Sequence, residues 1–431
     1  MKLNTKRVCL VGTAFFLICA FWQAYDAIIP ITLKNKFGYS ETQSGFVMAL
    51  DNIFAIFLLP LFGAISDKSR SRFGKRTPFI VIGTICAIVS FVALTVVDNA
   101  KIAALQAGEQ RVYLSALFIG VLLCSLLSMA VFRSPAVALM PDVVVKPLRS
   151  RANAIINLMG AVGGILVLGL GILFGTGKQE NVTMSCTGYV LAVCGLMFAA
   201  LLVFVFTVKE PKWNREMLQA QALLEDTPEP EEMVGDRKLT RSQLVSLILI
   251  LSSVVLWFFG YNAVTSKFSS YSTSVLGMDF NSTLMIAQAA AIVSYIPVGF
   301  VASKLGRKKT ILIGIGFLFT AFLGGAFLRE HSPVWLLYLL FVFAGIGWAT
   351  INVNSFPMVV ELSAGGNIGK YTGYYYTASM AAQIATPVAC GFLMDYTGKM
   401  EVLFPYAAFF VACSFVTMLF VRHGDAQEKK I

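Results

Sequence analysis

The feature that most constrains this chain is an apolar run that ends abruptly in a basic turn. The run covers residues 45–66 and contains one charged side chain, Asp51. The ten residues that follow, 67–76, hold five cations and one anion. An apolar segment of about 20 residues that stops at a cluster of Lys and Arg is typical of a membrane crossing that ends on the cytoplasmic side.

The same design returns in the second half of the chain, at residues 299–308. The glycines that precede the two basic turns are 236 residues apart, more than half of the 431-residue chain. At that offset Asp26 corresponds to Asn262, and Asp51 corresponds to Ala287. The sequence therefore predicts two similar halves, of which the first carries the intramembrane acids.

Composition indicates that both halves are built for lipid. The chain is 57% hydrophobic and 13% charged, whereas a soluble domain carries about 25% charged residues. We expect an all-α integral membrane protein with one six-helix bundle at 1–208 and another, followed by a short cytoplasmic tail, at 242–431. The twelve predicted transmembrane helices lie near residues 9–33, 42–65, 78–97, 112–140, 152–174, 187–208, 242–266, 281–303, 310–328, 333–358, 371–394 and 402–421.

The distribution of the 34 basic residues predicts the orientation in the membrane. With the N-terminus inside, 25 of them fall in the inner segments, 8 in the outer segments, and Arg133 within a span. This bias places both termini in the cytoplasm, and we expect a multi-pass protein of the plasma (inner) membrane. Because topology explains the net charge of +11, we expect no nucleic-acid partner.

The segment 209–241 is the one long polar stretch and is predicted to be a cytoplasmic linker. Its first part, 212–224, could form a short amphipathic helix on the inner face of the membrane. Its second part, 226–236, contains two prolines and a run of acids. That composition favours the alternative, in which the whole segment is a flexible tether between the halves.

The basic turn also resembles a family signature. Gly63-x-x-x-Asp67-Lys68 followed by Gly74-Lys75-Arg76 resembles the loop signature of the major facilitator superfamily. The longer segment 66–79 is similar to the form found in plant sucrose–proton symporters, their animal relatives and the glycoside–pentoside–hexuronide cation symporters. The segments 135–142 and 257–262 are similar to the fourth-span exit and the seventh span of that group. The resemblance implies two pseudo-symmetric six-helix bundles that rock about a central site.

Two features of the plant symporters are missing here. Those proteins carry an acid within the fourth span and an arginine just past the proline of its exit motif. The matching positions fall near Ser125 and Leu126, and at Val137. Proton uptake on the fourth span therefore cannot be inferred from the resemblance, and neither can sucrose as the substrate.

Asp26 and Asp51 are the candidate cation-coupling residues. At 1.5 Å per residue, Asp26 lies about 25 Å from the inner end of its span and Asp51 about 14 Å from the outer end, so the two share a similar depth. Carboxylates inside a membrane are functional by default, and the sequence indicates no cation at this depth. The alternative is a structural role, in which each carboxylate bonds to polar neighbours and holds two helices together. We expect at least one of them to bind H⁺ or Na⁺.

Aromatic and amide side chains at mid-depth are candidate substrate-binding residues. Sugars stack on aromatic faces and bond amides through their hydroxyls. Packing is the alternative role for any single aromatic, but buried amides are costly without partners, which favours binding. The candidates are Trp22, Gln23, Tyr25, Asn52, Tyr261, Asn262, Gln288, Trp348, Asn352, Tyr375 and Gln383.

The resemblance also implies a cytoplasmic gate around the basic turn. In the superfamily, the acid that matches Asp67 latches the cytoplasmic side by pairing with an arginine of a neighbouring turn. Its partner here could be Arg76, Arg149 or Arg151. The predicted gate residues are Gly63, Asp67, Gly74, Arg76, Arg133, Asp142 and Arg149.

Arg133 is included because of its position along the fourth span. Counted from the start of that span, it lies about 32 Å down the helix and hence near the inner face. It could join the gate and pair with Asp142, or it could extend to the interface and have no further role.

These features predict a secondary active transporter that moves a small polar solute, a sugar or glycoside, by symport with H⁺ or Na⁺ and alternating access. The alternatives are a drug or metabolite exporter of the same fold, and a non-transporting receptor or scramblase. We expect no enzyme activity, because the sequence shows no nucleophile–base pair or metal constellation. We expect a monomer in the lipid bilayer that binds a small molecule and needs no cofactor besides the coupling ion.

Overall fold

A computed structural model describes residues 3–109, 111–145, 148–225, 239–362 and 368–424. Within these ranges the secondary structure is helical, with no β-strand. The chain divides into two compact units. Unit 1 comprises Met1–Gly38, Asp51–Thr176 and Glu180–Pro230, and unit 2 comprises Tyr39–Leu50, Gly177–Gln179 and Glu231–Ile431.

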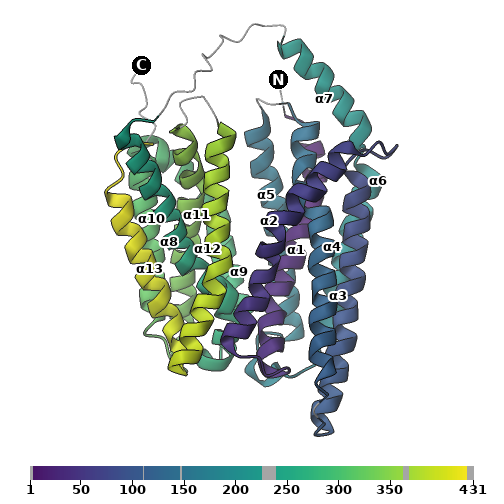
Figure 1. The fold of residues 1–431 in the computed structure, drawn as a ribbon, viewed down its shortest axis with the longest axis vertical. Coiled ribbons are helices and arrows are strands. Elements are labelled where there is room, and N and C mark those ends of the chain that lie inside the picture. Colours follow the sequence, from purple (N-terminus) through teal and green to yellow (C-terminus); the bar gives the residue numbers. More distant parts are fainter. Residues whose placement is uncertain (1–2, 110, 146–147, 226–238, 363–367, 425–431) are drawn as a thin grey trace. The chain divides into compact units, whose positions relative to one another are not determined.

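Apart from the start of α2 and residues 177–179, which belong to unit 2, each unit contains the helices of one predicted half (Figure 1). The helices of the first half are α1 (Thr5–Asn35), α2 (Glu41–Lys68), α3 (Thr77–Gln106), α4 (Tyr113–Val143), α5 (Arg149–Phe174), α6 (Thr187–Thr207) and α7 (Glu210–Glu225), with a 3₁₀ turn at Gln179–Asn181. Those of the second half are α8 (Arg241–Tyr271), α9 (Phe280–Leu305), α10 (Arg307–Gly325), α11 (Val334–Glu361), α12 (Ile368–Thr397) and α13 (Leu403–Leu419), with a π turn at Ser272–Leu276 and a 3₁₀ turn at Met400–Val402.

Side chains at the helix ends explain several of these boundaries. Before α8, the Thr240 hydroxyl accepts a bond from the backbone of Gln243, whose side chain bonds back to the backbone of Thr240. Before α9, the Asp279 carboxylate accepts two backbone N–H bonds. Both arrangements satisfy N–H groups that have no partner within the helix. α5 ends at Gly175, whose φ of +66° is a left-handed conformation that glycine adopts without strain.

The two units pack their helices in the same order. In unit 1, α1 contacts α5 and α6, and α3 contacts α4 and α6. In unit 2, α8 contacts α12 and α13, and α10 contacts α11 and α13. Each of these pairs in unit 2 has its counterpart in unit 1, with α8 in the place of α1 and α10 in the place of α3. The predicted internal repeat is therefore confirmed.

The helices are long enough to cross a bilayer. Eleven helices of the described part have the length and composition of membrane spans. The remaining predicted span corresponds to α9, whose 26 residues extend about 39 Å, against a hydrocarbon core about 30 Å thick. The chain is a multi-pass integral membrane protein of twelve transmembrane helices, as the sequence predicts.

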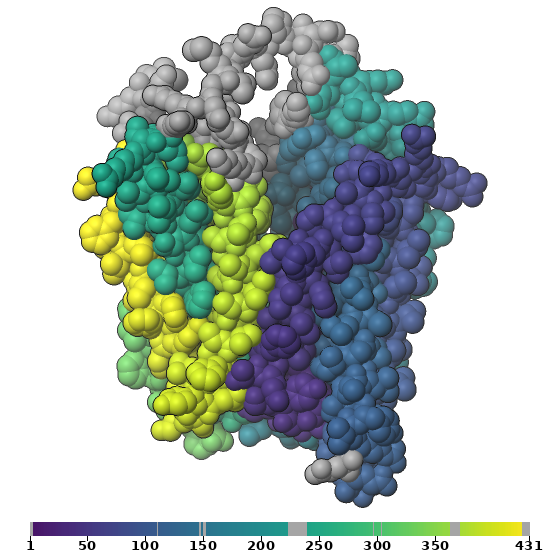
Figure 2. All heavy atoms as spheres, in the orientation of Figure 1, coloured from purple at the N-terminus to yellow at the C-terminus, as the bar shows by residue number. Residues whose placement is uncertain are grey.

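Helix α7 occupies the first part of the predicted linker. It packs against α4 and belongs to unit 1. Trp213 and Met217, one turn apart, are both buried and anchor it. Figure 2 shows α7 in teal at the surface of unit 1. The interpretation as a flexible tether is wrong for residues 210–225, and the rest of the predicted tether, 226–238, lies outside the described residues.

The start of α2 is held within unit 2. Residues 39–50 belong to that unit, and the rest of the helix belongs to unit 1. The Asp395 carboxylate of α12 accepts bonds from the backbone N–H groups of Glu41, at 2.9 Å, and Thr42, at 2.8 Å. Lys267 of α8 is fully buried and donates to the Glu41 carboxylate at 2.9 Å. This segment is therefore anchored by charge at its first turn.

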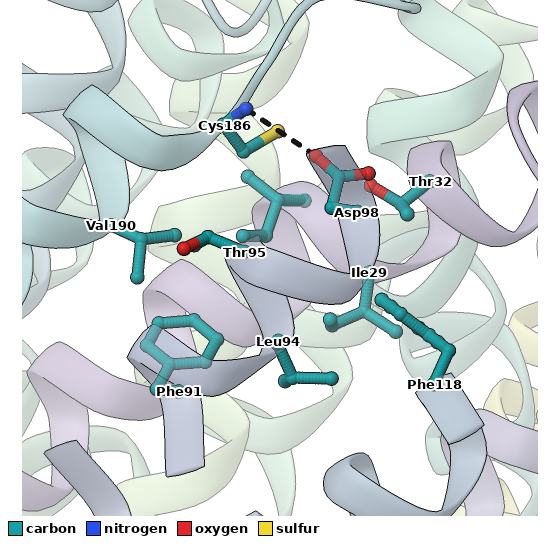
Figure 3. Close-up of a pocket in the computed structure, with 10 residues that line it drawn as sticks. Ile29, Thr32, Phe91, Leu94, Thr95, Asp98, Phe118, Cys186 and Val190 are labelled. Atoms are coloured by element: carbon teal, nitrogen blue, oxygen red, sulfur yellow. Dashed lines mark hydrogen bonds between the residues drawn. The ribbon is translucent and has the colours of Figure 1, made fainter. Parts of the chain in front are cut away.

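A second buried ion pair lies at the end of α1 in unit 1. The Lys36 amine lies 2.7 Å from both carboxylate oxygens of Asp98, and the two side chains are 1% and 5% exposed. The same amine donates to the carbonyl oxygen of Met184 at 2.8 Å. Figure 3 shows Asp98 at the rim of a small pocket that is otherwise largely apolar, with the backbone N–H of Cys186 directed at it. Because the protein itself satisfies both charges, we interpret this pair as structural.

Candidate functional site

Unit 1 contains a small pocket between α1, α2 and α4. Trp22 of α1, Asp51 of α2 and Arg133 of α4 line it. The Asp51 carboxylate accepts a hydrogen bond from the side-chain amide of Asn52 at 2.9 Å. A carboxylate, a guanidinium and an indole thus meet within the membrane-spanning part. The apolar walls include Phe54, Leu59, Leu126 and Met129.

Asp26 belongs to the same cluster. It is close enough to Asp51 for the two charges to interact. The neighbouring Tyr25 is 1% exposed, and its ring meets that of Trp22 edge-on at 5.3 Å. Two carboxylates that share a site repel each other when both are ionised, and this favours the uptake of a cation between them.

Arg133 does not lie at the predicted gate. Its guanidinium carbon is 5.6 Å from the centre of the Trp22 ring, and its charge interacts with that of Asp51. Asp142, its predicted partner, is nine residues further along α4, which is about 14 Å away and on the opposite helix face. The prediction failed because α4 has 31 residues, about 47 Å, so a position counted from its start overestimates the depth. The expectation that no cation lies near Asp51 is wrong for the same reason.

Several donors around this pocket have no acceptor in the part of the chain that is described. The Arg133 guanidinium makes no hydrogen bond or salt bridge to a described residue. Trp22 Nε1 and the Tyr25 hydroxyl are buried and likewise lack a partner among those residues. Buried polar groups are normally paired. These groups are therefore candidates for bonds to a solute or to water.

Unit 2 contains a cluster of aromatic side chains. Tyr261 of α8 stacks on Trp348 of α11, with ring centres 5.9 Å apart and planes 25° apart. Tyr295 of α9 meets the same indole edge-on at 6.2 Å, and its hydroxyl lies near the side chain of Asn352. Three predicted binding residues thus come together. Tyr295 was not predicted, although it follows Gln288 by seven residues and so lies on the same face of α9.

Asn262 and Gln288 carry buried polar atoms that have no partner among the described residues. These atoms are the amide nitrogen of Asn262 and the side-chain oxygen of Gln288. Leaving such a group unpaired costs about 1–3 kcal/mol. Both residues are therefore candidates for bonds to a solute, and in the repeat Asn262 is the counterpart of Asp26.

Three predicted binding residues belong neither to the pocket lining of unit 1 nor to the aromatic cluster of unit 2. The Tyr375 hydroxyl bonds to that of Ser355 at 2.9 Å, and the Tyr375 side chain is 5% exposed. The Gln383 amide donates to the carbonyl oxygen of Ser379 in its own helix, at 3.3 Å. Gln23 is half-buried on α1. The local bonds of Tyr375 and Gln383 are those of packing residues.

Arg76 organises the turn between α2 and α3. Its Nε donates to the Asp142 carboxylate of α4 at 2.8 Å. Its terminal nitrogens donate to the Asp67 carboxylate and, at 3.3 Å, to the carbonyl oxygen of Gly63. Lys75 adds a salt bridge to Asp142 at 3.2 Å. Of the three predicted partners of Asp67, Arg76 is the one that contacts it in the described structure.

Glu210 completes this turn and was not predicted. It is 2% exposed, and its carboxylate accepts bonds from the backbone N–H groups of Arg76, at 2.9 Å, and Thr77, at 2.8 Å. It thereby caps the start of α3, where N–H groups have no partner within the helix. Gly74 has a φ of +111°, and a Cβ at this position would collide with the Glu210 carboxylate. The arrangement therefore requires glycine.

Arg149 stabilises the end of α4 and makes no recorded contact with Asp67. Its guanidinium donates to the carbonyl oxygens of Pro141, at 2.8 Å, and Val144, at 3.1 Å. The last carbonyl groups of a helix have no partner within it, so this contact holds the helix end in place. The side chain of Arg151, the third predicted partner, lies outside the described residues.

Comparisons with known proteins agree with this architecture. The model of the Major Facilitator Superfamily matches residues 11–387 and 283–430. A cis,cis-muconate transport protein of Acinetobacter baylyi is 34% identical over 176 residues, which cover 38% of this chain and 40% of that protein. A sucrose transport protein of Arabidopsis thaliana is 30% identical over 180 residues, which cover 39% of this chain and 29% of that protein. The chain thus matches less than half the length of these two relatives.

Other relatives match over nearly the whole chain. An uncharacterized MFS-type transporter of Methanocaldococcus jannaschii is 22% identical over 418 residues, which cover 97% of this chain and 95% of that protein. The inward-open structure of the xylose transporter XylE from E. coli has a TM-score of 0.69 at 14% identity and covers 99% of this chain and 98% of that chain. Such a low identity shows the fold alone. Because the family model matches nearly the whole sequence, the chain belongs to the Major Facilitator Superfamily, a family of membrane transporters.

Proposed function

We propose that the protein is a secondary active transporter that moves a small polar solute, of the sugar or glycoside class, together with a cation by alternating access. The observation that carries this proposal is the cluster of Asp26, Asp51 and Arg133 beside the pocket of unit 1. Charged groups inside a membrane are costly and mark the paths of ions and substrates.

The net charge of this cluster supports coupling to a cation. With two carboxylates and one guanidinium ionised, the cluster carries one negative charge. Binding of one H⁺ or Na⁺ would make it neutral. During alternating access the cluster must pass from exposure on one side of the membrane to exposure on the other, and the free energy required is lower for a neutral cluster than for a charged one. We therefore assign the cation to Asp26 and Asp51.

A polar solute is supported by the amides and by the relatives. Asn262 and Gln288 hold buried polar atoms that no described residue satisfies. Tyr261, which is next to Asn262 in the sequence, stacks on Trp348 within the same unit. Sugars need both kinds of group. Two relatives are named as transporters of sucrose and of cis,cis-muconate, which are polar organic molecules.

The basic turn supports the proposed orientation and gate. We place the turn between α2 and α3 in the cytoplasm, together with both chain termini, in a plasma (inner) membrane. The bonds of Arg76 to Asp67 and Asp142 at this turn are those of a latch. The proposed working unit is a monomer, because each predicted half contributes its own set of candidate binding residues.

A transport screen tests this function. The purified protein is reconstituted into liposomes and offered labelled sugars and glycosides, with an inward or an outward gradient of H⁺ or Na⁺, or with no gradient. We expect accumulation that requires an inward gradient of one of the two cations. Accumulation driven only by an outward cation gradient would instead identify an exporter. Absence of both uptake and counterflow for the whole panel would contradict the proposal and favour a receptor or a scramblase.

A further inference from the structure

The pocket beside Trp22 has a chemical preference that the proposed function does not specify. Its polar side chains are those of Trp22, Asp51 and Arg133. Two of these can only donate hydrogen bonds, and Arg133 carries a permanent positive charge. We propose that the transported solute carries a carboxylate group and that Arg133 binds it. This inference rests on the proposed transport function and narrows its substrate class to acidic sugars.

The guanidinium of Arg133 has donors that the protein does not use. Its contact with the Trp22 ring, at 5.6 Å, is made through the face of the indole. No nitrogen of Arg133 makes a hydrogen bond or salt bridge to a described residue. A carboxylate fits such a guanidinium with two parallel N–H···O bonds. It therefore matches both the geometry and the charge of the donors.

Two other arginines of unit 1 show the contrast. Arg76 donates to Asp67 and Asp142, and Arg149 donates to two backbone carbonyl oxygens. The protein itself supplies acceptors to both. Of these three arginines, Arg133 is the one that lines a pocket and still has its donors available. This difference separates a binding residue from a structural one.

Asp51 explains how Arg133 is tolerated when no acid is bound. The two charges interact, but the side chains do not form a salt bridge in the described structure. A solute carboxylate can therefore reach Arg133 without first breaking a direct ion pair. Its arrival adds one negative charge near Asp51 and Asp26, so the loaded cluster becomes neutral when it holds two cations, and the added charge strengthens their binding. The acid and the driving cation thus favour each other's binding, and by linkage the effect is reciprocal.

The rest of the pocket lining is apolar. It includes the side chains of Phe54, Leu126 and Met129. Trp22 also lines the pocket, and its Nε1 is buried without a partner among the described residues. This donor is a candidate for a bond to a second oxygen of the solute.

Matched pairs of ligands that differ only in the acid test this inference. Binding of glucuronate and galacturonate is compared with that of glucose and galactose by calorimetry on the full-length protein in detergent. The variants are Arg133→Gln, which removes the charge, and Arg133→Lys, which keeps the charge and loses the paired donors. Arg149→Gln is the control, because that arginine contacts only backbone carbonyl oxygens among the described residues.

We expect at least one acid to bind the wild type about ten-fold or more tightly than its neutral partner. Arg133→Gln should abolish this preference, Arg133→Lys should retain part of it, and Arg149→Gln should leave it unchanged. The double variant Asp51→Asn/Arg133→Gln removes both charges, so it reports the same loss if the single variant is poorly folded. Equal binding of acid and neutral sugar, or no acid binding at all, would overturn the inference.

The inference and the proposed function can fail separately. If the acid binds through Arg133 but liposomes show neither uptake nor counterflow, transport is wrong and the binding site stands. If neutral sugars accumulate with a cation gradient and Arg133→Gln transports them normally, transport stands and the acid site is wrong.

Discussion

The Nε atom of Arg76 lies 2.8 Å from a carboxylate oxygen of Asp142, and this bond joins the start of α3 to the end of α4. The two side chains are 6% and 18% exposed. The other acid on Arg76, Asp67, is 57% exposed. Water screens exposed charges, so the contact of Arg76 with Asp142 should contribute more to stability than its contact with Asp67.

Replacing Asp142 should therefore destabilise the fold more than replacing Asp67. Asp142→Asn weakens a charged hydrogen bond to a buried arginine, for which we expect a loss of about 1.5–3 kcal/mol. Asp67→Asn should cost about 0–1 kcal/mol. Thermal unfolding of the two variants in detergent provides the comparison. Equal losses, or a larger loss for Asp67→Asn, would contradict the inequality.

Glu210 should be required for the start of α3. Glu210→Ala leaves the backbone N–H groups of Arg76 and Thr77 without their acceptor, and we expect a loss of about 1–2 kcal/mol. Gly74→Ala should destabilise the same turn, because it combines strain at positive φ with a collision against the Glu210 carboxylate. Glu216→Gln, a change on the same helix at a side chain that is 38% exposed, is the matched control. The comparison fails if the control loses as much unfolding free energy as Glu210→Ala.

The buried pair of Lys36 and Asp98 gives a sharper stability test. Lys36→Met leaves the Asp98 carboxylate buried without its counter-charge, which should cost about 3–5 kcal/mol. The double variant Lys36→Met/Asp98→Leu removes both charges and should recover most of that loss. Arg111→Gln, at an exposed ion pair with Glu109, should leave the unfolding midpoint unchanged. A double variant that is no more stable than Lys36→Met would show that the pair acts through more than its charges.

Removing the unpaired amides of Asn262 and Gln288 should lower the affinity for the solute but leave its coupling to the cation intact. Asn262→Ala or Gln288→Ala should weaken binding of a polyhydroxyl solute about ten-fold, since each lost bond is worth about 1–3 kcal/mol. Asn354→Ala is the control, because its amide already donates to Thr350 in its own helix at 2.8 Å. Calorimetry measures the affinities. If substitutions at Trp348 and Tyr261 abolish binding while both amide variants retain it, the sugar interpretation is wrong and the exporter becomes the better one.

The architecture could be predicted because its signals are repeated along the chain. Each span is a run of apolar residues that a bilayer demands, and the basic turns recur at an offset of 236 residues. The same offset pairs Asp26 with Asn262, so this correspondence could be found from the sequence without a structure. For α7 the signal was weaker: Trp213 and Met217 are spaced for one helix face, but the prolines and acids that follow favoured a tether.

The site could be predicted only in part, because depth along a helix is not position in the membrane. Arg133 was placed by counting from the start of α4, although the helix is longer than the bilayer is thick. Its contact with Trp22 depends on how α1 and α4 face each other, which no sequence pattern records. Glu210 was missed because its partners are backbone N–H groups of another helix, which carry no sequence signal.

The central claim is that Asp26 and Asp51 couple solute movement to a cation. The direct measurement is solute-driven cation entry into liposomes that contain the wild type, Asp26→Asn or Asp51→Asn, with exchange of labelled solute followed in the same vesicles. We expect the wild type to concentrate solute and take up H⁺ or Na⁺ with it. At least one variant should still exchange solute but neither concentrate it nor take up the cation. If both single variants concentrate solute as the wild type does, the account is contradicted.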